Sequence, residues 1–486
     1  MSATDWHSGG NCGEASHCLA PKKFWKESNI NTGATACFSN FPLSQNTLPS
    51  SARPHTAHSF LTLPPNFYNI VMVNTFSLEG KALKLDSAAD MDKHIAELKA
   101  NNDVEEVILV GNTLGVDACE ALAKVLETKK KIKVVNFADI FTARTYDEIP
   151  PAVTHLLTAL LALPELHTVN LSDNAFGVRT VAPLQPFLSQ HVPLQHLILN
   201  NNGLGPAAGT LVAEALTTLA GKKEQARKDG KTVPDLETVI CGRNRLEADS
   251  MEAWGHAYSA NNKVKTIRMT QNGIRKEGIS TLLQNGLSKC TALEVIDLQD
   301  NTFTAMGGRA LADVIANWSV IKEIGVGDCL LSARGAVMLA DALKSGKNKT
   351  LQTLRLQYNE IDAKGIAALC KVAQTDALPA LQRIELNGNK FSEEDADVEA
   401  LKTLLDERRE ENAPDVDADD ETWGVDELDD LEEDSDDDDE DIDDDEDAEE
   451  EQVLKQADQA ESENVAQEKD NSVDELADLM GKTELK

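Results

Sequence analysis

One short pattern of apolar and polar positions recurs along the chain between residues 104 and 391. Its clearest copy, LQHLILNNNGL, begins at Leu194, with leucine at positions 1, 4, 6 and 11 and Asn202 at position 9. Apolar residues two positions apart predict a short strand with one buried face. The asparagine and glycine after it predict a tight turn, and the longer stretch that follows has room for a helix. The pattern therefore predicts a series of units, each made of one strand, one turn and one helix.

Ten such units follow one another. Most starts are 28 to 30 residues apart, with two longer units of 34 and 42 residues, and they fall at Val104, Ile132, Leu166, Leu194, Leu236, Val264, Leu293, Ile321, Leu351 and Leu381. This spacing is typical of leucine-rich repeats (LRRs), and repeats of this length are similar to those of ribonuclease inhibitor. Helices are wider than strands, so stacking them on one side curves the array. We expect an α/β LRR solenoid in the form of a crescent, with strands inside and helices outside.

The asparagine at position 9 has a predicted structural role. Asn202 and Asn301 are two examples, and Cys329 takes the place of asparagine in one unit. A side-chain amide can both donate and accept, so it can satisfy the backbone groups that a sharp turn leaves inside the stack. Leaving those groups unpaired would cost about 1–3 kcal/mol each. Replacing such an asparagine should therefore destabilise the stack without removing any chemistry.

The two longer units depart from the pattern at defined places. The 42-residue unit contains an insertion, Gly221–Asp235, whose glycine, lysine and proline content predicts a solvated loop. The unit that begins at Ile132 has Ile140 at position 9 and a lengthened turn before a helix resumes near Pro151. A local departure from a consistent template is where function is expected. We therefore expect functional residues in this turn, which contains Asp139, Arg144, Tyr146 and Asp147.

The formal net charge of −37 is concentrated near the C-terminus. Residues 415–451 hold 26 acidic and no basic residues, whereas residues 1–414 carry a net charge of only −6. A surface of this sign repels nucleic acid and anionic membranes and attracts basic proteins. We therefore expect protein partners, no nucleic acid and no membrane, and an acidic tail that speeds association with a basic partner.

Composition divides the chain into three parts. Residues 1–71 show no helical or strand period, so we expect a disordered extension that need not belong to the mature protein. Residues 72–412 form the repeat domain, capped by residues 77–85 with the helix that follows Asp86, and by a charged helix over residues 393–412. Residues 413–486 are too acidic to bury a core and should be disordered. Within them, residues 472–480 are consistent with a short amphipathic helix, either a docking or transport signal or a helix without a partner.

Sequence signals for other chemistry are absent. The eight cysteines form no CxxC pair, and the histidines and cysteines near the N-terminus do not match a standard metal-site spacing. The chain contains no P-loop, no HExxH and no GxSxG in a strand–turn–helix context. No apolar run approaches the ~20 residues that span a bilayer, and no signal peptide is recognisable. We therefore expect no nucleotide hydrolysis, metal or cofactor in this chain, and a reducing intracellular compartment.

Several motifs are more specific than LRRs in general. DIFTARTYDEIP begins at Asp139 and NNGLGP begins at Asn201, and the further motifs are LSDNAFG, CGRNRLE, LQDNTFT, DCLLSARGA and LRLQYNEI. Together with an acidic tail directly after the repeats, these motifs resemble the Ran GTPase-activating protein family, and the tail resembles that of its fungal members. The resemblance extends from Met72 into the tail.

The resemblance implies acceleration of GTP hydrolysis on Ran, the small GTPase of nucleocytoplasmic transport. Ran in its GTP form would then supply the nucleotide, the Mg²⁺ ion and a glutamine that orients water, and this chain would need no cofactor. The resemblance further implies that Asn201 positions that glutamine. It implies that Arg144 is functionally important without acting as an inserted arginine finger. We also expect contact with Ran-binding proteins, action as a monomer, and a cytoplasmic or perinuclear location.

The positions of these residues agree with the implied roles. Asn201 is at position 8, next to the structural Asn202, so it can point outward while its neighbour points inward. The expected GTPase interface also includes Asp139, Tyr146, Asp173, Asn200, Asp300 and Asp328. Two alternatives remain open: Arg144 can form a surface ion pair with Asp139 or Asp147, and the position-8 aspartates can be merely solvated. For the whole protein, the alternative is a non-catalytic LRR scaffold or inhibitor.

Overall fold

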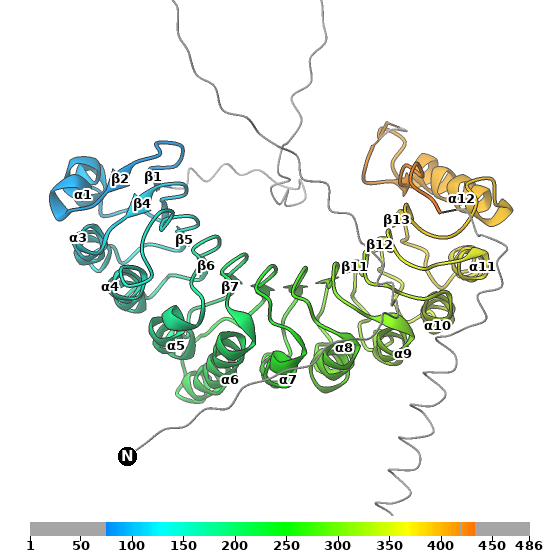
Figure 1. The fold of residues 1–486 in the computed structure, drawn as a ribbon, viewed down its shortest axis with the longest axis horizontal. Coiled ribbons are helices and arrows are strands. Elements are labelled where there is room, and N and C mark those ends of the chain that lie inside the picture. The colour runs from blue at the N-terminus through cyan, green and yellow to red at the C-terminus, as the bar shows by residue number, and fades with distance from the viewer. Residues whose placement is uncertain (1–73, 418–419, 433–486) are drawn as a thin grey trace, which may run out of the picture. The chain divides into compact units, whose positions relative to one another are not determined.

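The structure, a computed structural model, describes residues 74–417 and 420–432. Within them, short parallel strands line the inner side of an arc and helices cover the outer side (Figure 1). A second, two-stranded sheet is made by β2 (Lys84–Leu85) and β4 (Thr113–Leu114). The main sheet has twelve strands that pair in chain order: β1 (Thr75–Ser77), β3 (Glu106–Ile108), β5 (Val134–Asn136), β6 (Thr168–Asn170), β7 (His196–Ile198), β8 (Thr238–Ile240), β9 (Thr266–Arg268), β10 (Val295–Asp297), β11 (Glu323–Gly325), β12 (Thr353–Arg355), β13 (Arg383–Glu385) and β14 (Gly424–Val425).

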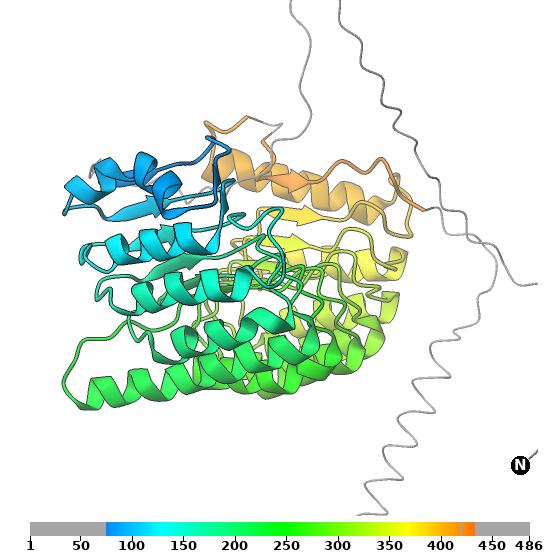
Figure 2. The ribbon, with the colours of Figure 1, turned by 60° about the vertical axis from the view of Figure 1, so that its left-hand side comes forward.

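The helices lie side by side in one layer behind the strands (Figure 2). Short 3-10 turns precede α5 and α7, and a π-helical stretch (Leu282–Gly286) follows α8. The α-helices are α1 (Ala88–His94), α2 (Ala96–Ala100), α3 (Val116–Leu126), α4 (Ile149–Leu161), α5 (Val181–Gln190), α6 (Gly205–Lys228), α7 (Met251–Ala260), α8 (Lys276–Thr281), α9 (Thr304–Ile315), α10 (Ala333–Leu343), α11 (Ala363–Ala373) and α12 (Ala396–Asn412).

The strands confirm the predicted repeat. In all ten units the strand occupies template positions 3 to 5, and like positions pair between neighbours, as in His196 opposite Thr238 and Leu197 opposite Val239. The central residue of each of these strands is buried, because alternate side chains of a strand face opposite sides of the sheet. The apolar residues at positions 1, 4, 6 and 11 therefore form one continuous core between the sheet and the helices.

The asparagines at position 9 form a hydrogen-bonded ladder through the turns, as predicted. Asn202 Nδ2 donates to the carbonyl oxygens of Leu171 (3.1 Å) and Leu199 (3.0 Å), and its Oδ1 accepts from the backbone N–H of Asn174 (3.0 Å). Where Ile140 replaces asparagine, its own N–H still donates to Asn174 Oδ1 over 3.0 Å. The ladder therefore reaches the backbone of the unit that breaks the sequence template, although the Ile140 side chain cannot extend it to Asn112.

The insertion in the longest repeat corrects one prediction. The solvated loop expected over Gly221–Asp235 is wrong for its first half, because α6 continues to Lys228. A glycine inside a helix costs about 1 kcal/mol relative to alanine. The buried Lys223 compensates, since its Nζ donates to the carbonyl oxygens of Val192 (2.7 Å), Leu194 (2.6 Å) and Pro234 (2.8 Å). These contacts fasten the added helical turns to the start and end of their own repeat and to Val192 of the preceding repeat.

The N-terminal cap agrees with its prediction. Strands β1 and β2 precede α1, whose first turn is closed by a capping box: the Ser87 hydroxyl accepts from the Asp90 N–H, and the Asp90 carboxylate accepts from the Ser87 N–H. Each bond satisfies a backbone or side-chain group that the helix end would leave unpaired. The buried residues of this cap, which include Leu85 and Met91, close the first end of the core.

The C-terminal cap is larger than predicted. Helix α12 confirms the charged helix expected over residues 393–412, but the prediction of disorder for residues 413–486 is wrong for residues 420–432. There β14 pairs with β13, and the Asp426 carboxylate accepts from the backbone N–H groups of Leu386 (2.6 Å) and Asn387 (3.0 Å). An uncovered last strand would leave unpaired backbone groups, and the buried Leu428 adds apolar contact. The start of the acidic segment therefore acts as an end cap.

The predictions for residues 1–71 and 472–480 lie outside the described residues. For residues 74–417 and 420–432, no helix has the length and apolar character required to cross a membrane.

Candidate functional site

The residues at template position 8 form a row along one edge of the stack. We call the following ten residues the position-8 row: Gly111, Asp139, Asp173, Asn201, Arg243, Gln271, Asp300, Asp328, Tyr358 and Gly388. All have positive φ angles, between 48° and 74°. This conformation is unfavourable for residues with a Cβ atom, so the surrounding structure must hold it. From Asp139 to Tyr358, each backbone N–H donates to the position-7 carbonyl oxygen of the next repeat, and this bond provides the support.

Asn201 is an exposed member of this row and lies beside Asp173 of the preceding repeat. Its side-chain Nδ2 donates to Asp173 Oδ1 over 2.8 Å, and its backbone N–H donates to the Gly242 carbonyl oxygen over 2.9 Å. The neighbouring Asn202 is fully buried in the asparagine ladder. Asn201 therefore points outward and Asn202 inward, as the template predicts.

Arg144 comes from the lengthened turn and folds back into the protein. Only 7% of its side chain is exposed. Its guanidinium donates to Asp86 Oδ1 (2.6 Å), to Thr113 Oγ1 (3.0 Å) and to the Thr113 carbonyl oxygen (3.0 Å). The alternative of a surface ion pair with Asp139 or Asp147 is therefore wrong. Arg144 instead ties the turn to the segment after β2 and to β4, which belong to the two preceding layers of the stack.

The same turn presents Tyr146 to solvent, with 67% of this residue exposed. The backbone N–H and the hydroxyl of Thr145 each donate to Glu148 Oε2 over 2.9 Å, just before α4 begins. These hydrogen bonds hold the pKa of the Glu148 carboxyl below its usual value. At the other end of the turn, the Thr142 hydroxyl donates to the Asp139 carboxylate. The turn is thus fixed at both ends around an exposed aromatic side chain.

Asn200 differs from the other residues expected at the interface. Its Oδ1 accepts from the Gly242 N–H over 2.7 Å, and its backbone N–H donates to Ser172 Oγ over 3.2 Å. A Cβ at Gly242 would lie 3.2 Å from this oxygen and 2.7 Å from Thr270 Oγ1, so glycine permits the close approach. Asn200 therefore braces three consecutive repeats, and its amide oxygen is already engaged within the stack.

Two acidic members of the row, Asp300 and Asp328, lie in consecutive repeats. Asp328 is exposed and Asp300 is partly buried. Burial and the charge of Asp328 raise the pKa of Asp300, whereas a hydrogen bond from Gln271 and the charge of Arg243 act in the opposite direction. The carboxylates of Asp300 and Asp328 therefore lie close enough for their negative charges to affect each other.

The inner face of the C-terminal repeats contains a continuous series of ion pairs, which the sequence analysis missed. Arg268 contacts Asp297 (2.7 Å) and Glu323 (2.9 Å), and Glu323 also contacts Arg355. The series continues to the C-terminal cap, where Arg383 donates to the carbonyl oxygens of Trp423 (3.0 Å) and Val425 (3.2 Å). We call Arg268, Asp297, Glu323, Arg355, Glu385 and Arg383 the inner-face ion chain. Opposite charges at template positions 3 and 5 of successive repeats were the signal that could have revealed it.

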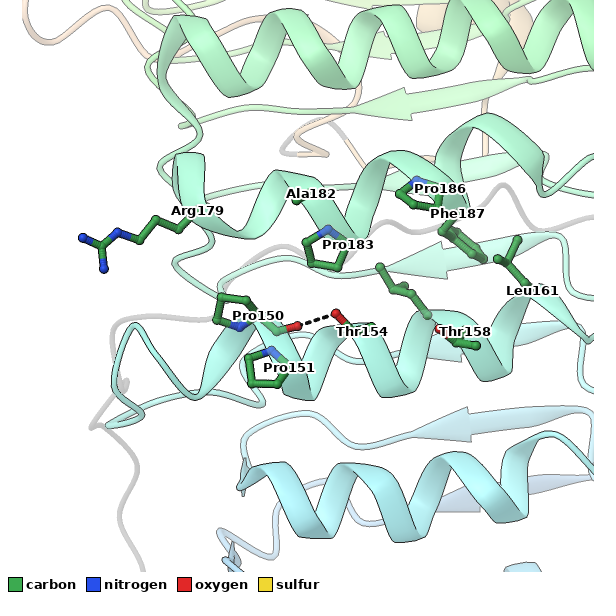
Figure 3. Close-up of a pocket in the computed structure, with 11 residues that line it drawn as sticks. Pro150, Pro151, Thr154, Thr158, Leu161, Arg179, Ala182, Pro183, Pro186 and Phe187 are labelled. Atoms are coloured by element: carbon green, nitrogen blue, oxygen red, sulfur yellow. Dashed lines mark hydrogen bonds between the residues drawn. The ribbon is translucent and has the colours of Figure 1, made fainter.

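A shallow groove of about 400 Å³ lies between α4 and α5 on the helical side (Figure 3). Prolines from both helices line it, and Phe187 forms part of its wall. Arg179 is the one charged residue among those that line it, and its side chain extends away from the groove. The lining has no acid–base pair or nucleophile, so this groove does not resemble a catalytic pocket.

Among residues 74–417 and 420–432, no group of three or more His, Cys, Asp or Glu side chains is arranged to hold a metal ion.

The fold defines a leucine-rich-repeat protein whose position-8 row is held along one edge by backbone hydrogen bonds. A Leucine Rich repeat family model matches residues 347–370. The chain is 38% identical over 339 residues to Ran GTPase-activating protein 1 of Saccharomyces cerevisiae, which covers 68% of this chain and 82% of the yeast protein. This chain therefore belongs to the Ran GTPase-activating protein family.

Two further comparisons describe how far the similarity extends. The chain is 39% identical over 201 residues to Ran GTPase-activating protein 1 of Xenopus laevis, covering 41% of this chain and 34% of the frog protein. It is 27% identical over 252 residues to the ribonuclease inhibitor of Sus scrofa, covering 51% of this chain and 52% of the inhibitor. The similarity to the yeast protein thus spans much more of both chains than the similarity to the inhibitor.

Proposed function

We propose that this chain is a GTPase-activating protein for Ran and accelerates GTP hydrolysis by positioning the catalytic glutamine of the GTPase. Family membership supports the activity and the partner. The Asn201 carboxamide, exposed on a backbone whose conformation is fixed, supports the mechanism. This amide is the single observation on which the mechanistic proposal chiefly rests.

The chemistry required of the activator is limited. A small GTPase already binds GTP and Mg²⁺ and contains a glutamine that orients the attacking water. A partner that holds this glutamine in productive geometry lowers the barrier by removing conformational freedom before the reaction. Asn201 suits this task because a carboxamide can accept a hydrogen bond from one group and donate one to another. The chain then needs no nucleotide site, no cofactor and no hydrolytic activity of its own.

Arg144 acts in this proposal as a positioning residue. An arginine finger must reach the transferred phosphoryl group from an exposed position. The guanidinium of Arg144 is almost fully buried and donates to Asp86 and Thr113. Its contribution is to fix the turn that carries Tyr146 close to the position-8 row.

The proposed interface follows the edge of the stack. It contains Tyr146 together with four carboxylates of the row, Asp139, Asp173, Asp300 and Asp328. Carboxylates on an edge favour a basic surface on the partner and increase the rate of encounter at low salt. We propose that a monomer binds Ran in its GTP form, alone or with Ran-binding proteins. A cytoplasmic or perinuclear location would keep Ran in its GDP form outside the nucleus.

Single-turnover GTP hydrolysis by Ran, measured with catalytic amounts of this protein, tests the proposal. The wild type should accelerate hydrolysis strongly, and Asn201→Gly should reduce the rate constant by about 100-fold or more. Glycine is the appropriate replacement because it tolerates the positive φ angle of residue 201. Asp341→Asn, which changes an exposed carboxylate on α10, serves as the control and should retain full activity.

A non-catalytic scaffold or inhibitor is the competing function, but the comparisons do not favour it, because the similarity to the yeast protein spans more of both chains than the similarity to ribonuclease inhibitor. A scaffold would leave the hydrolysis rate of Ran unchanged. Absence of acceleration by the folded wild-type protein would therefore reject the proposed activity and support the scaffold.

A further inference from the structure

We propose that Asp173 is a positioning residue for this reaction: it orients the Asn201 carboxamide so that the amide oxygen, Oδ1, faces the partner. The inference rests on the proposed function and assigns one more residue to the same site. Asp173 and Asn201 occupy position 8 in consecutive repeats, and the 2.8 Å hydrogen bond between their side chains runs along the row.

The chemistry of the two side chains fixes the direction of this bond. An ionised carboxylate only accepts hydrogen bonds, whereas a carboxamide has a donor end and an acceptor end. Asn201 can therefore approach Asp173 favourably only with its NH₂ group, since the opposite orientation would place Oδ1 against a negative charge. The carboxylate thus selects one of the two orientations that a 180° rotation of the amide would exchange, and Oδ1 is turned away from Asp173.

The backbone leaves the pair little other freedom. The φ angles are 61° at Asp173 and 53° at Asn201. The Asp173 N–H donates to the Asn200 carbonyl oxygen and the Asn201 N–H to that of Gly242, both over 2.9 Å. These bonds fix both Cα positions, so only the side-chain torsions remain to be ordered. Across the part of the chain that the structure describes, the bond to Asp173 is the one hydrogen bond of the Asn201 side chain, and it leaves Oδ1 available to a partner.

An outward-facing Oδ1 selects a donor on the GTPase. The NH₂ group of the glutamine side chain is such a donor, and its engagement would leave the glutamine oxygen free to accept a hydrogen bond from the attacking water. With the Asn201 amide reversed, NH₂ would face NH₂ and this contact would be lost. Asp173 therefore acts on the rate of the chemical step through Asn201, without touching the substrate itself.

Three side chains at position 173 give a graded test, with kcat and KM measured for Ran loaded with GTP. The native carboxylate accepts only, Asp173→Asn permits both amide orientations, and Asp173→Lys donates only and would hold Asn201 by its oxygen. We expect kcat to fall by about 2–5-fold in Asp173→Asn and by about 30-fold or more in Asp173→Lys. Asp341→Lys is the matched control, because it reverses the charge of an exposed carboxylate on α10, outside the position-8 row. Both kcat and KM of this variant should stay within about twofold of wild type.

A double-mutant cycle tests whether Asp173 acts through Asn201. In an Asn201→Gly background, Asp173→Lys should cause no further loss of kcat, and thermal unfolding should show that all variants are folded. A kcat for Asp173→Lys within twofold of wild type would overturn the inference, as would an equal loss in both backgrounds. Either result with an active wild-type protein leaves the proposed function intact, whereas an inactive wild type rejects both.

Discussion

The edge around Asn201 and the inner face of the C-terminal repeats use polar side chains in opposite ways. In the inner-face ion chain, each carboxylate lies against one or more guanidinium groups, and the series ends on carbonyl oxygens of the cap. At the edge, Arg144 and Asp173 engage neighbouring groups so that Tyr146 and the Asn201 amide oxygen remain available. A polar group can serve a partner only if it retains unused hydrogen-bonding capacity. The same repeat therefore produces a self-paired surface in one region and, in another, an edge that presents exposed side chains.

The comparison also separates the residues proposed to contact a partner from those that hold them in place. Tyr146 and Asn201 are exposed, whereas Arg144 and Asn200 are engaged inside the protein. Substitutions of the first pair should change activity with little change in stability. Substitutions of the second pair should change both.

The largest combined effect on rate and stability at the edge is expected from Arg144→Ala. Removing the guanidinium takes this donor from the Thr113 carbonyl oxygen, leaves Asp86 with its longer ion pair to Lys84 (3.5 Å), and releases the turn that carries Tyr146. Misplacement of about 1 Å at such a site can lower the rate about 100-fold, and the broken contacts should destabilise the protein by about 2 kcal/mol. Single-turnover hydrolysis and urea unfolding would measure both effects. A loss of rate without any loss of stability would instead indicate that Arg144 contacts the partner directly.

Truncation should have the largest effect on the C-terminal region. Deletion of residues 414–486 removes β14, the buried Leu428 and the carbonyl oxygens that Arg383 contacts, and should lower the free energy of unfolding by about 3 kcal/mol. Deletion of residues 433–486 keeps the cap and should leave the free energy of unfolding unchanged. Thermal or urea unfolding of the two deletion variants would distinguish them, and equal stabilities would contradict a capping role for residues 420–432.

The shorter deletion also isolates the charge of the tail from its structural role. Removing residues 433–486 should slow association with Ran at low salt if the acidic tail attracts a basic partner, and the difference should disappear at high salt. Stopped-flow association rates at two salt concentrations would measure this effect. An unchanged rate at low salt would rule out electrostatic attraction by the tail.

A smaller effect is expected from pH at His191, which follows α5. Burial lowers its pKa to about 4, although a 2.7 Å hydrogen bond between Nε2 and the Leu166 carbonyl oxygen acts in the opposite direction. The unfolded chain therefore takes up a proton near pH 6.5 that the folded protein does not bind until about pH 4. This contribution to stability is complete above pH 6.5 and declines as pH falls, by about 2 kcal/mol between pH 7 and pH 5. Urea unfolding should show a weaker pH dependence in His191→Gln, and an identical dependence would contradict this assignment.

The smallest effect is expected from Glu323→Gln in the inner-face ion chain. The neutral side chain would remove the negative charge that lies between the guanidinium groups of Arg268 and Arg355. The free energy of unfolding should therefore fall by about 1 kcal/mol. The hydrolysis rate of Ran should stay within about twofold of wild type, because this face is separate from the position-8 row. A large loss of activity in a stable Glu323→Gln variant would show that the two regions are coupled.

Much of the fold followed from local pattern. Apolar positions 1, 4, 6 and 11 predicted the strands and core, and the position-9 asparagines predicted the ladder seen at Asn202. The insertion at Gly221–Asp235 was predicted wrongly because the hydrogen bonds that hold Lys223 come from carbonyl oxygens far away in the chain. The start of the acidic segment was predicted wrongly for a related reason. Its few apolar residues are too sparse to form a core alone but sufficient to cover one that already exists.

The sequence by itself determined the repeat, the alternation of outward Asn201 with inward Asn202, and the family to which the motifs point. These depend on spacing along the chain, which sets the direction of each side chain within its own repeat. Tertiary structure alone decided that Arg144 is buried against Asp86 and that Asp173 holds the Asn201 amide. Those partners lie 58 and 28 residues apart and meet only because the repeats stack in register. The sequence of each repeat therefore supplies the polar side chains, but hydrogen bonds between repeats set the orientation of those side chains.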